Sequence, residues 1–276
     1  MNGIRIAACA TIALLSLQLT SADAAIKQRD VTIQTKAAGS LTGRLYAPDQ
    51  ADAVPGVLVL HTAGGLRDAD HLHARTLAEA GFAALVVSYP IGWVASVNEG
   101  LAEAATWLRA QKESLQMPIG VMGFSLGASK ALLVAALRPQ FIKAVVSYYG
   151  TYNADISKFK AAAQKARAAS MQATPSPVQV AGRLSAAVLL LQGENDDETP
   201  PDQTAQMKAA LEKGKKTYEL VIYPGAVHMF EREPKYHPPG NRTSFGTVTG
   251  YDAAAAKDSW EKSVAWLNRY LRSEAK

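Results

Sequence analysis

Short apolar segments alternate with longer helical patterns along most of this chain. The segments Gly56–His61 and Ala83–Ser88 are near-continuous apolar runs, which is typical of strands covered on both faces. Between them, Ala69–Ala80 has a helical pattern and ends just before Gly81, a residue suited to terminating a helix. Repeated alternation of this kind predicts an α/β fold with a mostly parallel central sheet and helices on both faces.

The alternation continues toward the carboxyl end, and an antiparallel hairpin is expected before it at Val31–Thr35 and Leu41–Tyr46. Ligands bind beyond the carboxyl ends of the strands in such sheets, so the residues after each strand are the candidates for a site. Further strands are expected at Ile119–Met122, Ala144–Tyr149, Val188–Gln192 and Tyr218–Tyr223, and further helices at Val97–Ala110, Leu126–Leu137, Asp202–Leu211 and Ala253–Leu271.

The motif Gly123-Phe124-Ser125-Leu126-Gly127 lies between an expected strand and an expected helix. In this context G-x-S-x-G predicts a nucleophile elbow, a strained turn that projects the serine hydroxyl above the sheet. Side chains two residues before or after Ser125 would collide with neighbouring elements, which explains the two glycines. The motif therefore predicts the α/β-hydrolase fold, with Ser125 as the nucleophile.

A serine hydroxyl is a weak nucleophile near neutral pH and needs a general base that a third group orients. Five histidines are available. His71 and His73 are two apart on an expected helix and are interpreted as solvated, whereas His237 lies beside two prolines in an irregular loop. His61 precedes the loop expected to shape the oxyanion hole. His228 follows the last expected strand and is best placed to reach the serine.

The acid is expected between Ser125 and His228 in sequence, because hydrolases of this fold order their triad in that way. A strand ending at Gln192 leads into a segment with four acidic residues, of which we choose Asp196, with Asp197 second. The remaining acids are interpreted as a solvated loop. The segment reads Gly193-Glu194-Asn195-Asp196-Asp197-Glu198-Thr199-Pro200.

Two backbone amides are expected to bind the oxyanion that forms during acyl transfer. The loop Thr62-Ala63-Gly64-Gly65 follows the strand that ends at His61, and its small residues allow close backbone approach. We assign the amide of Ala63 to this role, with Thr62 as its neighbour. The amide of Leu126, directly after the nucleophile, is the second.

With these residues in place, the chain resembles the dienelactone hydrolase family from roughly Pro55 to Leu271, most weakly in Thr151–Arg183. The family's G-x-x-D pattern with a later proline falls on Gly193, Asp196 and Pro200. The motifs that carry the resemblance are HTAGGLRD at 61–68, LAEAGFAALVVSY at 77–89, GFSLG at 123–127, GENDDETPP at 193–201, YPGAVHMFER at 223–232 and YDAAAAKDSWEKSVAWLNRYL at 251–271.

The resemblance is to the serine-bearing branch of that family. Enzymes that act on dienelactone itself carry a cysteine at the elbow and a glutamate in the loop after the third strand, where this chain has Ser125 and Thr62. Arg232 falls where such enzymes place an arginine that binds the substrate carboxylate, and a surface arginine is the alternative interpretation.

Three aromatic residues just past expected strand ends, Trp93, Tyr148 and Tyr149, are candidates to line an acyl or aromatic pocket. Buried packing explains them nearly as well. Two segments interrupt the strand–helix alternation and are candidate covers for the site or surface excursions: Thr151–Arg183, with a basic helix, and the Pro/Gly-rich loop Glu231–Gly250.

The first 24 residues predict a secretory signal peptide: one positive charge, an apolar stretch, and Ala22-Asp23-Ala24 before the cut. An uncleaved anchor is the alternative. Cleavage would remove Cys9, the chain's one cysteine, and leave about 250 residues as a single hydrolase domain, 25–276. A periplasmic or secreted protein is expected, without stable membrane insertion after cleavage. The net charge of +5 is mild and gives no reason to expect nucleic-acid binding.

These features together predict a serine esterase or lactonase that hydrolyses a small-molecule ester or lactone through an acyl-enzyme, with no metal or organic cofactor. A serine peptidase or an acyltransferase would use the same triad, because substrate choice depends on the pocket. A non-catalytic envelope protein that binds a ligand is the alternative from another class. The sequence leaves the oligomeric state open.

Overall fold

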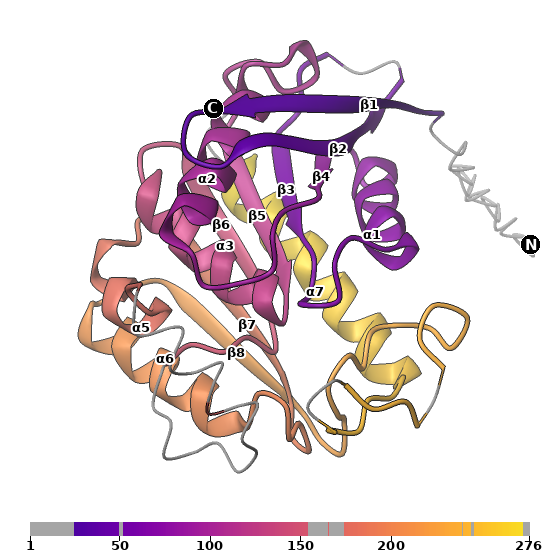
Figure 1. Ribbon diagram of the computed structural model, residues 1–276, viewed down its shortest axis with the longest axis vertical. Helices are drawn as coiled ribbons and strands as arrows, with labels where there is room; N and C mark the ends of the chain where they lie inside the picture. Colours follow the sequence, from indigo (N-terminus) through magenta and orange to yellow (C-terminus); the bar gives the residue numbers. More distant parts are fainter. Residues whose placement is uncertain are drawn as a thin grey trace, which may run out of the picture.

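The computed structural model describes residues 25–49, 52–153, 165, 174–238, 240–243 and 246–272 (Figure 1). One eight-stranded sheet runs through the molecule in the order β1-β2-β4-β3-β5-β6-β7-β8. Strands β3 to β8 are parallel to one another, whereas β1 pairs antiparallel with β2, and β2 pairs antiparallel with β4. The strands are β1 Ile26–Thr35, β2 Gly39–Pro48, β3 Gly56–Leu60, β4 Ala83–Val87, β5 Ile119–Phe124, β6 Ile142–Tyr148, β7 Ala187–Gly193 and β8 Tyr218–Tyr223.

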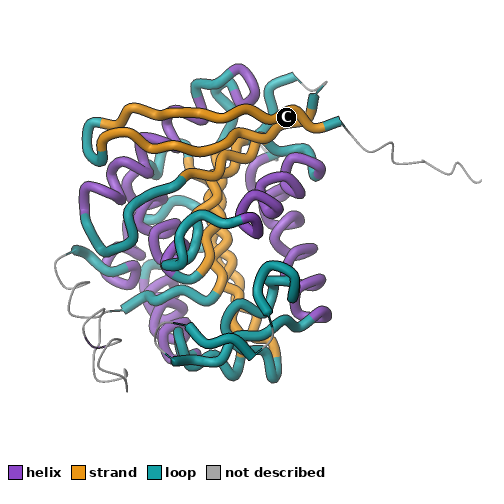
Figure 2. The backbone as a smooth tube through the Cα atoms, turned by 45° about the vertical axis from the view of Figure 1, so that its right-hand side comes forward, coloured by secondary structure: helices purple, strands orange, loops and turns teal. Residues whose placement is uncertain are grey.

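Helices cover both faces of the sheet (Figures 1 and 2). On one face, α1 and α7 pack on the sheet, and on the other face α2, α3 and α6 do so. Alternate residues of β3 enter the two cores, because Leu58 packs on the α2–α3 side and Val59 on the α1–α7 side. The helices are α1 Asp68–Glu79, α2 Ala95–Arg109, α3 Leu126–Leu137, α6 Pro201–Lys213 and α7 Ala253–Leu271.

This architecture confirms the predicted mostly parallel sheet with an amino-terminal hairpin and helices on both faces. Both hairpin strands are longer than expected, because backbone pairing continues the ladder from Ile26 in β1 and from Gly39 to Pro48 in β2. Short helical segments not anticipated from the sequence occur at η1 Lys112–Ser114, α5 Pro177–Val180 and η3 Ala181–Arg183. At α5, Ser176 accepts a hydrogen bond from the Gln179 amide, and the Gln179 side chain binds back to Ser176.

Several sequence-based expectations fall outside the described residues. These are the signal peptide at 1–24 and most of the possible cap at 151–183, including its basic helix. Within the described ranges, each helix is too short or too polar to cross a membrane.

Candidate active site

Ser125 occupies a strained turn between β5 and α3, at the carboxyl end of the sheet. Its backbone angles, φ 52° and ψ −112°, lie in a region that residues other than glycine rarely adopt. A Cβ at Gly123 would lie 2.1 Å from the carbonyl oxygen of Gly127, and one at Gly127 would lie 2.2 Å from that of Leu60. Both glycines are therefore required by close backbone packing, as the elbow motif predicted.

His228 lies in the loop after β8, and its imidazole reaches the serine. The Nε2 atom lies 3.1 Å from Ser125 Oγ. Both side chains are buried, with Ser125 3% and His228 1% exposed. The amide of Gly250, shortly before α7, donates a hydrogen bond to the His228 carbonyl and so holds the backbone of this loop.

Asp196, in the loop after β7, lies behind the histidine. Its Oδ2 is 2.7 Å from His228 Nδ1, while its Oδ1 accepts hydrogen bonds from the amides of Glu198 at 2.9 Å and Thr199 at 2.8 Å. Asp197, the second choice, is exposed. A carboxylate facing Nδ1 requires a proton there, which leaves Nε2 free to accept the proton of the serine.

Thr199 is part of this arrangement and was missed by sequence reasoning. Its hydroxyl lies 2.9 Å from Asp196 Oδ2 and 2.9 Å from the carbonyl oxygen of Tyr149. It therefore holds the acid in place from the β6 side. The signal available was its position shortly after Asp196, because an aspartate side chain often binds the backbone of the residues that follow it.

The expected oxyanion amides border the serine. Ala63 lines the same cavity as Ser125, and Leu126 begins α3. Among the described residues, none accepts a hydrogen bond from either amide. Both are therefore available donors beside the nucleophile.

The cavity above Ser125 and His228 has a volume of about 530 Å³, within the range of small-molecule sites. Its wall is polar and carries three arginines, Arg67, Arg232 and Arg242. Glu198 also lines it and is 3% exposed, which corrects the interpretation of this residue as part of a solvated loop. The hydroxyls of Thr243 and Thr247 donate to its carboxylate and so compensate its burial.

Arg232 is buried rather than on the surface, with 3% of its area exposed. Its guanidinium lies 2.9 Å from Asp70 and 3.3 Å from Glu231. Burial alone would lower the pKa of Arg232, but these two carboxylates outweigh it and raise that pKa. Burial raises the pKa of Glu231. Arg232 and the hydroxyl of Tyr149, which donates a hydrogen bond to the Glu231 carboxylate, oppose this rise. The charge of Arg232 is thus already compensated within the protein.

The structure does not bring the expected aromatic residues into this cavity. Trp93 is 5% exposed and packs in the core on the α2–α3 side. Tyr149 is fully buried behind the histidine, with its ring 4.6 Å from that of His228 in an edge arrangement. Tyr148 packs between Phe124 and Phe230. Buried packing, the alternative interpretation, describes all three.

The histidines other than His228 and His61 also differ from expectation. His73 is buried, stacks on Phe124 at 4.3 Å, and has its pKa lowered to about 3 by burial. It was expected in solvent. That expectation was wrong because tertiary packing defines the buried face of α1, and the sequence pattern alone does not reveal it. His71 is half-buried and bonds the hydroxyl of Tyr46, while His237 lines the active-site cavity and bonds Thr249.

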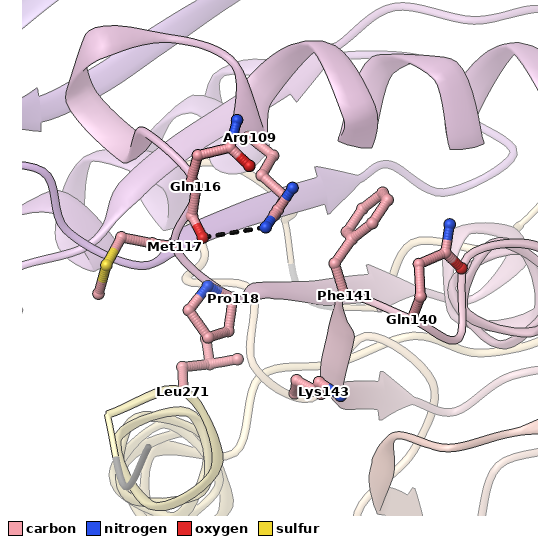
Figure 3. Close-up of a pocket in the computed structure, with 8 residues that line it drawn as sticks. All are labelled: Arg109, Gln116, Met117, Pro118, Gln140, Phe141, Lys143 and Leu271. Atoms are coloured by element: carbon pink, nitrogen blue, oxygen red, sulfur yellow. Dashed lines mark hydrogen bonds between the residues drawn. The ribbon is translucent and has the colours of Figure 1, made fainter. Parts of the chain in front are cut away.

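A second hollow, of about 270 Å³, lies at the opposite edge of the sheet (Figure 3). Its lining includes Met117 and Pro118, just before β5, and Phe141, just before β6. These are the amino ends of the strands, whereas Ser125 follows the carboxyl end of β5. In the part of the chain that the structure describes, no cluster of three or more His, Cys, Asp or Glu side chains could hold a metal ion.

A serine on a strand–helix elbow, followed by an aspartate and a histidine after later strands of a mostly parallel sheet, defines the α/β-hydrolase class. Comparison with known proteins agrees. The model of the dienelactone hydrolase family matches residues 92–271. The chain therefore belongs to the dienelactone hydrolase family.

Individual relatives support this assignment. A Salmonella typhimurium protein named as a candidate carboxymethylenebutenolidase is 31% identical over 150 residues, 54% of this chain and 46% of that protein. A Methylorubrum extorquens protein of the same name is 26% identical over 273 residues, 87% of this chain and 84% of that protein. The matches span about half the length of most of the curated relatives.

Solved structures show the same fold. A crystal structure of a candidate dienelactone hydrolase from Klebsiella pneumoniae superposes with a TM-score of 0.70 at 24% identity. The superposition covers 89% of this chain and 100% of that one. The chain thus has the architecture of this solved structure.

Proposed function

We propose that this hydrolase cleaves a small-molecule carboxylic ester or lactone through an acyl-enzyme on Ser125. One observation carries the proposal: Asp196, His228 and Ser125 form a continuous hydrogen-bonded line, of which His228 and Ser125 line a cavity of about 530 Å³. The name of one relative points the same way, because a Bradyrhizobium protein that is 24% identical over 153 residues is named as a candidate 2-oxo-3-(5-oxofuran-2-ylidene)propanoate lactonase.

The geometry supports the following sequence. His228 Nε2 removes the proton from Ser125 Oγ as the oxygen attacks the carbonyl carbon, and the imidazolium is stabilised by Asp196. The amides of Ala63 and Leu126 stabilise the oxyanion of the tetrahedral intermediate. His228 then returns the proton to the departing alkoxide, which in a lactone stays attached to the acyl group. A water molecule, activated by His228, releases the acid.

Three arginines on the cavity wall are compatible with a substrate that carries an acidic group. Arg232 is the residue that the family resemblance pointed to, but Asp70 and Glu231 already neutralise it. Arg67 and Arg242 are the better candidates for contact with such a group. Trp93 and Tyr149, which lie outside the cavity, are assigned no substrate contact.

The decisive test is Ser125→Ala, assayed with p-nitrophenyl acetate and a panel of lactones. We expect turnover to fall to the background rate while the far-UV circular dichroism spectrum is unchanged. Ser185→Ala, at an exposed serine away from the cavity, is the matched control and should retain full activity. Retained activity in Ser125→Ala would contradict the proposal, as would failure of a fluorophosphonate probe to label Ser125.

Peptide substrates, and esters supplied together with an acceptor alcohol, complete the panel. Faster turnover of peptides, or transfer to the alcohol in preference to water, would reassign the same triad to a peptidase or an acyltransferase. Absence of turnover and of probe labelling would favour a ligand-binding envelope protein.

We also propose export, on the basis of the amino-terminal sequence pattern alone. Mass spectrometry of the protein recovered from its native compartment should give a mature chain that begins at Ala25. A mature chain that retains residues 1–24 would refute cleavage at that site.

A further inference from the structure

His61, directly after β3, makes two contacts that fix its protonation. Its Nδ1 lies 2.7 Å from the carbonyl oxygen of Thr62, which can only accept a hydrogen bond. Its Nε2 lies 3.4 Å from the backbone nitrogen of Tyr89, whose N–H can only donate. The two contacts together require a proton on Nδ1 and a lone pair on Nε2, which is one tautomer of the neutral ring.

The ring is also held rigidly in place. It stacks on the Tyr89 ring with centroids 3.8 Å apart and planes 10° from parallel, and the Tyr89 hydroxyl donates to the His61 carbonyl at 2.6 Å. His61 is completely buried. Burial lowers the pKa of His61, and the cations Arg232 and Lys130 lower it further against the opposing effects of Thr62 and Asp70. The imidazole therefore stays neutral and keeps its one N–H for Thr62.

The contact with Thr62 determines where the next amide points. The carbonyl of Thr62 and the N–H of Ala63 belong to the same peptide group, and in a trans peptide they point in opposite directions. No cis peptide bond occurs among the described residues. With the Thr62 oxygen held on the His61 ring, and further by the Gly65 amide at 3.2 Å, the Ala63 N–H must point away from that ring.

We propose that His61 is the positioning residue of the oxyanion hole, acting through the Thr62 carbonyl to aim the Ala63 N–H at the substrate oxyanion. This inference rests on the proposed function. Hydrogen bonding at the carbonyl also polarises the peptide group, which makes the Ala63 N–H a stronger donor. His61 does not touch the substrate itself, since Thr62, Ala63 and Gly64 line the cavity in front of it.

Two variants of similar polarity separate this role from simple core packing. In His61→Asn the side-chain amide can occupy the position of Nδ1 and donate to Thr62. In His61→Gln the side-chain carbonyl oxygen reaches the position of Nε2 and accepts from the Tyr89 N–H, while the Thr62 carbonyl is left without its donor. We expect kcat for p-nitrophenyl acetate to fall about 10- to 100-fold in His61→Gln, below the 10²–10³-fold cost of losing an oxyanion donor outright. His61→Asn should stay within about fivefold of the wild type, and KM should change little in either.

The second measurement is inhibition by phenylboronic acid, which adds to an active serine as a tetrahedral adduct and resembles the intermediate. In His61→Gln its inhibition constant should rise by the same factor by which kcat/KM falls. If His61 acted through packing alone, kcat would fall to a similar extent in His61→Asn and His61→Gln, or KM and the inhibition constant would change together. Either result would overturn the proposal.

Nitrogen-15 NMR of the histidines in the unaltered protein tests the premise without relying on the folding of a variant. A neutral His61 with its proton on Nδ1 supports the proposal, and a proton on Nε2 overturns it. If the wild type neither hydrolyses esters nor binds the boronic acid, the proposed function fails. If the wild type does both and His61→Gln behaves like the wild type, only this inference fails.

Discussion

The sharpest consequence of the triad geometry concerns Asp196→Asn, a change that keeps shape and removes charge. Asp196 Oδ1 accepts two backbone hydrogen bonds, from Glu198 and Thr199. An asparagine must therefore keep its carbonyl oxygen at that position, because an NH₂ group there would face two other donors. Its NH₂ group then faces His228 Nδ1.

That arrangement reverses the tautomer of the histidine. With a donor from residue 196 at Nδ1, His228 must accept there and carry its proton on Nε2, the atom 3.1 Å from Ser125 Oγ. The imidazole can then no longer accept the serine proton. Comparable loss of the correct tautomer costs about 10⁴-fold in kcat, which is about 5 kcal/mol in the activation barrier.

Steady-state hydrolysis of p-nitrophenyl acetate gives kcat, and thermal unfolding followed by circular dichroism checks the fold. Asp197→Asn is the matched control, since this exposed neighbour should tolerate the same change with kcat within twofold. A folded Asp196→Asn protein with kcat within tenfold of wild type would refute the reasoning from the two backbone amides. Equal losses in both variants would refute the assignment of the acid to Asp196.

Three further predictions concern stability and are measured by urea unfolding. Gly127→Ala places a Cβ 2.2 Å from a backbone carbonyl oxygen of β3 and should lower the free energy of unfolding by at least about 2 kcal/mol. Gly182→Ala, with open space around it, is the control and should change that free energy by less than about 0.5 kcal/mol. The folded-state pKa of His73 is about 3, below the ordinary value of 6.5, so the unfolded chain binds the extra proton and stability falls as pH drops from about 6.5 toward 3. His73→Phe should remove about 3 kcal/mol of that loss at pH 4, and an unchanged pH dependence would contradict this. Arg232→Met leaves two buried carboxylates without their cation and should lower the free energy of unfolding by about 3–5 kcal/mol. If adding Asp70→Asn to this variant restores none of the lost stability, the ion pair is not the cause.

The sequence was sufficient for the architecture because each parallel strand is buried on both faces. Segments such as β3 and β4 are continuous apolar runs whose alternate residues enter opposite cores, so they are distinct from the helical patterns between them. The helix after Ser125 and the final helix begin and end at the expected residues. The hairpin ends and α5 were missed because they depend on backbone pairing and capping rather than on apolar periodicity.

The candidate site was predictable where local geometry restricts residue type. At the elbow, two backbone oxygens approach positions 123 and 127 so closely that only glycine fits, and that restriction is visible as a motif. Asp196 and His228 follow from their places after β7 and β8. Trp93 was a candidate for the cavity but packs in the core on the α2–α3 side. A residue just past a strand end can point toward either the cavity or the core, and the sequence does not show which.

Arg232 shows why the rest of the site could not be predicted. Its partner Asp70 lies 162 positions away, and no local pattern relates the two residues. Asp70 also accepts the backbone amide of Arg67 at 2.9 Å, at the end of the loop that begins with the oxyanion segment. One buried carboxylate therefore joins the oxyanion loop to the loop that carries His228.

Arg232 in turn contacts Glu231, which binds the Tyr149 hydroxyl behind the histidine ring. The two halves of the site are therefore held in place by charges that face the protein interior. Arg232 therefore stabilises the arrangement of the site from inside the protein. A substrate carboxylate would have to displace Asp70 or Glu231 to bind its guanidinium.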